Sequence, residues 1–400
     1  MNLKKAFGIL AIVIFGGIFL FLMIAMLVYS PTYVYRTLAW QESDAFDWQK
    51  FPAHPLQASP TAYHFKSAPD PRVNELFEQL SGADDWDSFL EANNTQAFIV
   101  IQDGVVIYEN YFNNTQRDSI VTSFSVAKSF ASTLIGKAIE EGYINSVDDP
   151  ITTYLPELAE RDPHFEGITI RHLLLMASGL EYEAFRPLLF NSDDILTTYY
   201  PDQRQITLEN THIIDQPGQY FHYNKYHPQL LGMILERATG MSVTAYLQSR
   251  FWEPLGMEFD GSWSTDSEAS DFEKMETGVN ARAIDFAKFG TLFLNGGNWQ
   301  GNQVISKAWV DEATQPYFPQ NYPDYYPEGF ASLPGDSYYK YMWWGMEREE
   351  GTFDFAAEGD KGQFIYVSPE NKMVIVRNGI DYGIPSGEWL KLFFEFASQF

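Results

Sequence analysis

The hydrophobic pattern of the chain begins with one long apolar run near its start. Residues 6–29 hold 24 positions without a charged side chain, about 36 Å of α-helix at 1.5 Å per residue, which is enough to cross a bilayer. Lys4 and Lys5 precede the run and Arg36 follows it, so the positive-inside rule predicts a cytoplasmic N-terminus. We therefore expect residues 1–30 to be a single-pass anchor in the inner (cytoplasmic) membrane, with the rest of the chain on the outer, periplasmic side.

A cleaved signal peptide is the alternative interpretation of this run. The apolar core of a signal peptide spans about 7–15 residues and ends in small residues. The run in this chain is longer and ends with Met26-Leu-Val-Tyr-Ser30. The pattern favours an anchor that is not cleaved.

The hydrophobic pattern after the run has no clear period until about residue 72. Prolines and aromatic residues are scattered through residues 31–72, which indicates a stalk or linker that partly packs on the following domain. Residues 73–90 then show helical spacing. Two apolar stretches, Ala97–Ile101 and Val105–Tyr111, flank Asp103-Gly104, and this arrangement predicts a two-strand hairpin.

Helical spacing returns after Ser125 and ends near Glu140, and a mostly helical lobe is expected over about residues 140–278. Strand-like stretches follow between Trp343 and Arg377, and residues 388–399 close the chain as a helix. An early hairpin, a long helical insertion and late strands predict an α+β fold for residues 73–400, in which the first and last strands share one sheet.

Composition and charge exclude several classes of function. The net charge of −27 argues against a nucleic-acid partner, because phosphates require Lys and Arg. The absence of cysteine excludes disulfides and thiolate zinc sites. The histidines form no His-Glu-x-x-His motif, and the chain has neither a Gly-x-Ser-x-Gly pentapeptide nor a Walker loop. We expect no metal and no cofactor.

The candidate chemistry lies in Ser125-Val-Ala-Lys128. Residues at i and i+3 share a helix face, and a serine in the first helical turn lies near free backbone N–H groups and the positive end of the helix dipole. A lysine packed behind it and partly desolvated can act as a base. A second copy, Ser337-Tyr-Tyr-Lys340, follows Pro334-Gly335 and is predicted to lie in a loop. The first copy is therefore the candidate nucleophile and base.

Five further stretches accompany the first copy in a fixed order. They are Asp148-Asp-Pro-Ile-Thr-Thr-Tyr-Leu-Pro-Glu157, Ile168-Thr-Ile-Arg-His-Leu-Leu-Leu-Met-Ala-Ser-Gly179, Pro217-Gly-Gln-Tyr-Phe-His-Tyr223-Asn-Lys-Tyr, Gln229-Leu-Leu-Gly232 and Gly362-Gln-Phe-Ile-Tyr-Val367. With these motifs the chain resembles the serine β-lactamase-related superfamily over about residues 97–383. The resemblance is greatest to its class C-like branch, which includes D-alanyl-D-alanine carboxypeptidases, β-lactamase-fold esterases and 6-aminohexanoate-dimer hydrolases.

This resemblance implies a β-lactamase/transpeptidase-like fold, with an antiparallel sheet flanked by helices, an all-helical lobe, and the site between them. It implies that Ser125 is the acylated nucleophile and Lys128 its base. Tyr223 matches the tyrosine that protonates the leaving group and activates water. The backbone N–H groups of Ser125 and Gln363 would form the oxyanion hole.

Two motifs depart from the pattern of this superfamily. The usual Tyr-x-Asn is replaced by Tyr223 followed by Asn224 and Lys225, so the amide is either displaced by one residue or replaced by a cation. The usual Lys-Thr-Gly or His-x-Gly aligns with Asp360-Lys361-Gly362. We expect these five positions, 224, 225 and 360–362, to contact substrate, with Lys225 and Lys361 together supplying the missing positive charge and lowering the pKa of the catalytic lysine.

The resulting hypothesis is a membrane-anchored serine hydrolase that cleaves amide or ester bonds of small substrates through an acyl-enzyme on Ser125. One alternative is a D-alanyl-D-alanine carboxypeptidase or β-lactamase-like enzyme that acts on peptidoglycan peptides. Another is a non-catalytic cell-wall-binding or sensor module of the same fold. Aromatic pairs could line an acyl pocket, although such residues more often pack in a core; they are Tyr199-Tyr200, Tyr325-Tyr326, Tyr338-Tyr339 and Trp343-Trp344.

Overall fold

The computed structural model describes residues 3–186, 190–318, 330–349 and 351–400. Its centre is an eight-stranded sheet with the order β10-β11-β12-β13-β14-β3-β4-β2. Every neighbouring pair is antiparallel except β2 and β4, which are parallel. The strands are β2 (Lys66–Ser67), β3 (Thr95–Gln102), β4 (Val105–Tyr111), β10 (Asp336–Lys340), β11 (Trp343–Glu349), β12 (Thr352–Gly359), β13 (Gln363–Ser368) and β14 (Met373–Gly379).

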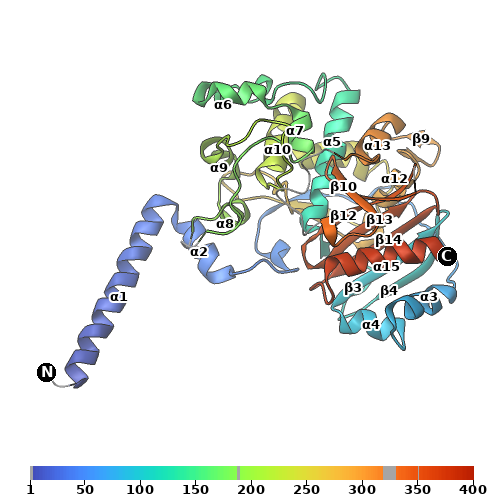
Figure 1. Cartoon of the computed structure of the whole chain (residues 1–400), viewed down its shortest axis with the longest axis horizontal. Coiled ribbons are helices and arrows are strands. Elements are labelled where there is room, and N and C mark those ends of the chain that lie inside the picture. Colours follow the sequence, from blue (N-terminus) through green and yellow to red (C-terminus); the bar gives the residue numbers. More distant parts are fainter. Residues whose placement is uncertain (1–2, 187–189, 319–329, 350) are drawn as a thin grey trace.

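Helices cover both faces of this sheet, as Figure 1 shows. Alternate residues of β3 point to opposite faces: Phe98 and Val100 pack in the core beneath α15, while Ile99 and Ile101 pack in the other core with α5 and α12. The first face carries α3 (Arg72–Ser81), α4 (Trp86–Ala92) and α15 (Ser386–Gln399), and the second carries α5 (Ala127–Glu140) and α12 (Ala283–Leu294). The prediction that the early hairpin and the late strands share one sheet is confirmed by the pairing of β3 with β14.

A helical lobe stands beside the second face. It contains α6 (Pro156–Arg161), α7 (Ile170–Leu174), α8 (Asp193–Tyr199), α9 (Gln203–Asn210), α10 (Tyr226–Thr239) and α11 (Val243–Leu247). Thr169 caps α7 in a reciprocal capping box with His172. Gly240 ends α10 with a φ of 68°, the left-handed conformation that favours glycine. The predicted α+β class, with a helical lobe inserted in the chain, is confirmed.

A second, four-stranded sheet was not foreseen from the pattern. Its order is β1-β6-β7-β5, with β1 (Ala53–Leu56), β5 (Val121–Thr122), β6 (Gly261–Ser264) and β7 (Val279–Ala281). These strands are two to four residues long and come from distant parts of the chain. Short segments with remote partners leave little periodic signal. The chain also forms a small hairpin, β8 (Asn298–Trp299) with β9 (Asn302–Gln303), and helix α13 (Lys307–Thr314).

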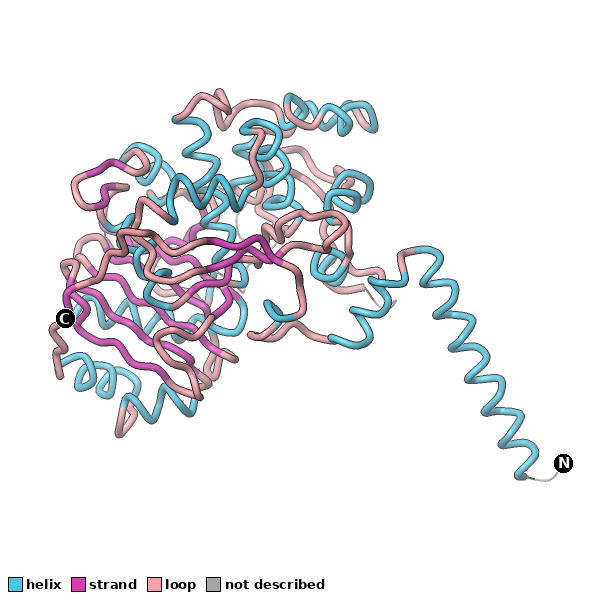
Figure 2. The backbone as a smooth tube through the Cα atoms, turned by 180° about the vertical axis from the view of Figure 1, so that it is seen from behind, coloured by secondary structure: helices cyan, strands magenta, loops and turns pink. Residues whose placement is uncertain are grey.

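The N-terminal helix α1 (Leu3–Val28) projects away from the folded body (Figures 1 and 2). Its residues Phe7–Val28 form the one helix among the described residues that is long and apolar enough to cross a membrane. Helix α2 (Pro31–Trp40) follows. Figure 2 shows the two helices at an angle, with α2 lying against the body of the domain.

The segment 31–72 packs on the domain more extensively than the partly packed stalk or linker that the sequence predicted. Tyr33 and Val34 of α2 are buried, and the Arg36 guanidinium donates to the carbonyls of Tyr199 at 3.2 Å and Asp266 at 2.7 Å. Strand β1 pairs with β6, and β2 pairs with β4. The prolines that suggested irregular chain occupy positions where proline is tolerated, such as Pro31 in the first turn of α2.

Three further predictions concern short segments of the chain. The helical stretch at residues 73–90 is two helices, because Gly82 ends α3 with a φ of 71°. The segment Ser337–Lys340 is not a loop but lies in strand β10. The predicted hairpin turn at Asp103-Gly104 is confirmed, since both residues have the positive φ values that such a tight turn requires.

Candidate active site

The candidate nucleophile lies in a single helical turn that leads into α5. Residues Phe124–Val126 form a 3₁₀ turn, and α5 begins at Ala127. This geometry places Ser125 and Lys128 on one face, as the sequence predicted, and the Lys128 Nζ donates to the Ser125 Oγ at 2.7 Å. The hydroxyl and the amine are therefore in direct hydrogen-bond contact.

Lys128 is almost completely buried. Its side chain is 1% exposed, and its Nζ donates a second hydrogen bond to the carbonyl of Glu276 at 3.0 Å. Burial, and secondly the positive charge of Lys225, lower the pKa of Lys128 to about 7. A substantial fraction of this amine is therefore neutral at physiological pH and able to accept a proton.

Tyr223 lies on the other side of the lysine, just before α10. The Lys128 Nζ is 5.1 Å from the centroid of the Tyr223 ring. That ring stacks on Trp344 at 6.1 Å and meets Tyr339 edge-on at 6.0 Å. The structure thus brings together the three residues that the sequence analysis placed at the centre of the site.

Of the two residues that follow Tyr223 in the altered second motif, one is buried in the lobe and the other faces the cavity. Asn224 is fully buried; its amide nitrogen donates to the carbonyl of Leu180 at 3.2 Å, and its oxygen accepts from the backbone N–H of Tyr226 at 2.8 Å. It therefore holds the start of α10, and the prediction that it contacts substrate was wrong. Lys225 instead faces the candidate site, where it pairs with Asp194 of α8 at 2.5 Å. The amide of the motif is replaced by a cation.

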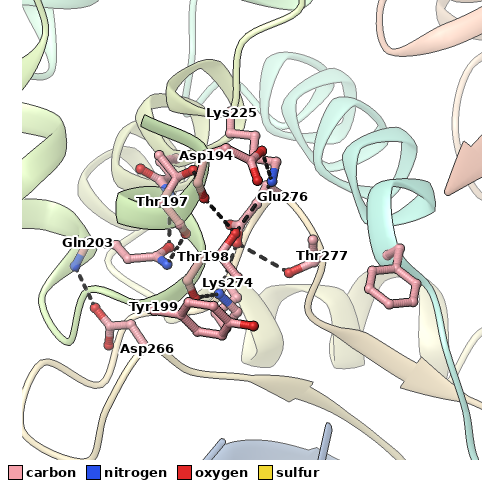
Figure 3. Close-up of polar contacts among 12 residues, drawn as sticks. Asp194, Thr197, Thr198, Tyr199, Gln203, Lys225, Asp266, Lys274, Glu276 and Thr277 are labelled. Carbon is pink, nitrogen blue, oxygen red and sulfur yellow. Dashed lines mark hydrogen bonds and ion pairs between the residues drawn. The ribbon is translucent and has the colours of Figure 1, made fainter. Parts of the chain in front are cut away.

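A network of charges lies beneath the site, and Figure 3 shows how its members converge. Lys274 donates to Glu276 at 3.0 Å and to the carbonyl of Thr198 at 2.7 Å. Glu276 is fully buried. Burial alone would raise the pKa of its carboxyl, but the neighbouring charge of Lys274 and further hydrogen bonds outweigh it, so the pKa is lowered. No sequence motif marks Asp194, Lys274 or Glu276, because only the tertiary fold brings Asp194 and Glu276 near Lys128 and Lys274 beside Glu276.

Strand β12 ends against the turn that carries Ser125. A Cβ added to Gly359 would lie 2.3 Å from the carbonyl oxygen of Ser123 and 3.0 Å from the backbone nitrogen of Ser125, so only glycine fits. The next two residues, Asp360 and Lys361, line the cavity that contains Ser125. The third motif is therefore brought to the site by the end of β12.

The two residues after Lys361 do not line this cavity. Gly362 is buried, and its carbonyl accepts from Arg377 at 2.7 Å. Gln363 is buried too, with its amide donating to the carbonyl of Gly379 at 2.7 Å. The burial of Gly362 argues against its predicted substrate contact. The predicted oxyanion role of Gln363 concerns its backbone N–H, which the contacts of its side chain do not test, so that role stays a prediction. Gln363 pairs with Gly359, which lies against Ser125.

The cavity has a volume of about 1050 Å³, and one of its walls comes from the N-terminal segment. That wall includes Trp40, Trp48 and Phe51, which no motif marked. Among the aromatic pairs considered from the sequence, Tyr199 lines the cavity, whereas Tyr325 and Tyr326 lie outside the described residues. Within the described part of the chain, no group of three or more His, Cys, Asp or Glu side chains is arranged to hold a metal ion.

Comparison with known proteins places the chain in a family. The family model described as Beta-lactamase matches residues 89–378, which include Ser125, Lys128, Tyr223 and the end of β12. The chain belongs to the beta-lactamase family. It is therefore a member of a hydrolase family with the β-lactamase/transpeptidase-like fold.

Relatives of the chain support this assignment. It is 27% identical over 309 residues to the 6-aminohexanoate-dimer hydrolase of Paenarthrobacter ureafaciens, and the match covers 73% of this chain and 74% of that protein. A solved structure from Bacillus anthracis, assigned as a 6-aminohexanoate-dimer hydrolase, superposes with a TM-score of 0.72 at 25% identity over 90% of this chain and 92% of the other. A class C β-lactamase shares the fold at 16% identity, with a TM-score of 0.59 and coverage of 82% and 96%.

Proposed function

We propose that the chain is a serine hydrolase that cleaves an amide or ester bond through an acyl-enzyme on Ser125. The observation that carries the proposal is the 2.7 Å contact between the Ser125 hydroxyl and a buried Lys128 whose pKa is lowered to about 7. A pure binding module has no physical need to keep a desolvated amine against a hydroxyl, since burying this group destabilises the fold. The non-catalytic alternative is disfavoured for this reason.

The reaction proceeds in two halves. In the first, the Ser125 Oγ attacks the substrate carbonyl while its proton passes to neutral Lys128; the bond to the amine or alcohol then breaks, and the leaving group takes a proton through Lys128 and Tyr223. In the second, water loses a proton to the same pair and attacks the ester on Ser125, releasing the carboxylic acid and restoring the hydroxyl. Splitting one displacement into two lowers the barrier of each.

The oxyanion of the tetrahedral intermediate requires two backbone donors. We assign one to the N–H of Ser125, at the N-terminal end of α5. We assign the other to the N–H of Gln363, as the family resemblance implies, because Gln363 pairs with Gly359, which lies against Ser125.

The substrate class follows from the walls of the cavity and from the relatives. Of the three lysines that line the cavity, Lys225 and Lys274 are each paired with a carboxylate. The third, Lys361, directly follows Asp360, which stands where related enzymes carry a cation. A substrate with a free carboxylate, such as a β-lactam, therefore gains little charge attraction there. Linear amides and esters, including oligoamides of the aminohexanoate type, rank ahead of β-lactams and peptidoglycan peptides. We further propose that α1 anchors the enzyme in the cytoplasmic membrane, with its catalytic domain on the outer side.

A fluorophosphonate probe tests the proposal, because it labels only activated serines. The intact mass of the full chain in detergent is measured after exposure to the probe, beside Ser125→Ala and Lys128→Ala. Labelling of the wild type and loss of labelling in both variants is the expected result. An unlabelled wild type with a normal circular dichroism spectrum would reject the proposal. A labelled enzyme is then given a panel of amides, esters and β-lactams.

A further inference from the structure

One wall of the catalytic cavity is built by the segment that directly follows α1. Trp40 ends α2, and Trp48 and Phe51 follow it; all three line the cavity together with Ser125. The domain's own contribution to this wall includes Ile195 and Tyr199 of α8. The N-terminal segment thus brings aromatic rings to the cavity, beside polar and acidic residues of the same segment, which are Thr37, Gln41, Glu42, Ser43, Asp44 and Asp47. The floor around Lys225 and Lys274 is charged.

The aromatic residues of this wall hold one another in place. Trp40 meets Phe51 edge-on at 5.1 Å and Tyr199 at 5.9 Å, and the rings of Phe51 and Tyr199 are stacked at 6.5 Å. The buried Arg36 guanidinium lies 5.1 Å from the centroids of both Trp40 and Phe51. Mutually packed aromatic rings form a rigid apolar surface, which is well suited to an extended hydrocarbon chain.

The wall is continuous with the base of the apolar helix. A single hydrophobic cluster joins Ala25 of α1, Tyr33 of α2, and the cavity residues Phe51 and Tyr199. The Tyr200 hydroxyl donates to the carbonyl of Tyr29 at 3.0 Å and fixes the end of α1 to the lobe. Apolar packing is therefore continuous from the end of α1 to two residues that line the catalytic cavity.

The outer side of the same segment exposes large apolar side chains. Tyr35 is 62% exposed, Leu38 43% and Phe46 44%, and they flank the cavity-lining residues in the sequence. With the apolar surface of α1 beside them, these side chains suit a lipid or interfacial environment. The segment thus exposes apolar side chains on its outer side, and on its inner side it brings Trp40, Trp48 and Phe51 to the cavity that contains Ser125.

We infer that residues 37–51 form an apolar-chain subsite, and that the substrate is an amphiphilic ester or amide whose long hydrocarbon chain lies against Trp40, Phe51 and Tyr199. This inference rests on the proposed function, because the subsite acts only if Ser125 is acylated. A membrane lipid and a dissolved amphiphile share this chemistry. Comparing vesicle-embedded ester with ester dissolved below its micelle concentration distinguishes the two sources.

The test measures kcat/KM for 4-nitrophenyl acetate and 4-nitrophenyl decanoate with the full chain in detergent. Each buried CH₂ contributes about 0.8 kcal/mol at most, so the decanoate is expected to exceed the acetate by about tenfold or more. Trp40→Ala and Phe51→Ala are expected to lower the decanoate-to-acetate ratio by about fivefold or more, by the same burial argument. Tyr143→Ala, an exposed aromatic outside the cavity, is the matched control and keeps the ratio.

Ethyl and dodecyl fluorophosphonates provide a measurement that needs no variant. Faster labelling of wild-type Ser125 by the dodecyl probe supports the subsite. Equal labelling rates, or a decanoate-to-acetate ratio near one, would overturn the subsite while leaving the proposed hydrolase intact. Absence of labelling by either probe would instead reject the proposed function and the subsite with it.

Discussion

The chain contains two copies of Ser-x-x-Lys. One lies on a helical turn and the other on a β-strand, so the serine and lysine side chains meet in the first copy and not in the second. Ser125 and Lys128 lie on one helical turn with the Oγ and Nζ 2.7 Å apart. Ser337 and Lys340 lie on strand β10, where residues three apart point to opposite faces. The Ser337 hydroxyl donates to the carbonyl of Phe330, and Lys340 lies 3.6 Å from Glu312.

Burial lowers the pKa of Lys340 as well. A depressed lysine pKa is therefore not sufficient for this chemistry. The hydroxyl must lie within reach of the amine, and a helix provides that spacing where a strand does not. The same substitution can therefore be made in each copy, and the strand copy serves as the control for the helical copy.

The sharpest test of this difference removes each hydroxyl in turn. Ser125→Ala is expected to lower kcat by about 10⁴-fold or more, as for other nucleophile deletions, while Ser337→Ala keeps wild-type turnover. Ester hydrolysis and fluorophosphonate labelling measure both. A similar loss of activity in the two variants would show that Ser125 is not the nucleophile.

Replacing each lysine is the next largest change. Lys128→Met is expected to lower kcat by about 10²–10⁴-fold, the range for loss of a general base. Lys340→Met leaves kcat of the folded enzyme unchanged. Steady-state kinetics on protein verified by its thermal melting curve separates the two, and a fully active Lys128→Met would refute the role of the base.

Each copy also has a glycine packed nearby that leaves no room for a side chain. A Cβ on Gly359 would meet Ser123 and Ser125, whereas one on Gly335 would meet the carbonyl of Glu347 at 2.3 Å. Gly359→Ala is expected to lower kcat by about 100-fold, since a displacement of about 1 Å at the nucleophile suffices for this. Gly335→Ala destabilises the fold but keeps kcat. Active-site titration corrects both for the folded fraction.

The pH–rate profile tests the cation beside the helical copy. Lys225 holds the pKa of Lys128 down, and its removal also leaves Asp194 unpaired; both effects raise the pKa of Lys128. Because only neutral Lys128 acts as a base, the acidic limb of kcat/KM in Lys225→Met is expected to move to higher pH. Lys361→Met serves as the comparison, since Lys361 is not among the charges that shift Lys128. An unmoved limb in Lys225→Met would reject this explanation.

The smallest expected effect on catalysis is that of Asn224. Its buried hydrogen bonds stabilise the start of α10, so Asn224→Ala is expected to lower the free energy of unfolding by about 1–3 kcal/mol. The KM for a short ester should remain that of the wild type. Urea unfolding and kinetics on the same preparation give both values, and a raised KM at unchanged stability would restore Asn224 as a substrate contact.

Local pattern determined much of this molecule. The helical copy, the Asp103-Gly104 hairpin and the apolar run of α1 were all predicted, because each depends on neighbours within a few residues in the chain. The family resemblance added Tyr223 and the fold of the domain. These features share a physical basis in helix spacing, turn conformation and continuous apolar surface.

Only the tertiary structure determined which side chains surround the turn that carries Ser125. Whether Asn224 or Lys225 faces the site depends on how α10 packs on the lobe. Glu276 reaches Lys128 from 148 residues away along the chain. The segment 31–72, which looked irregular, becomes a cavity wall through pairing with β6 and packing on α8. Such contacts join residues far apart in sequence, and their free energy is realised only when the whole core closes, so no local pattern carries them.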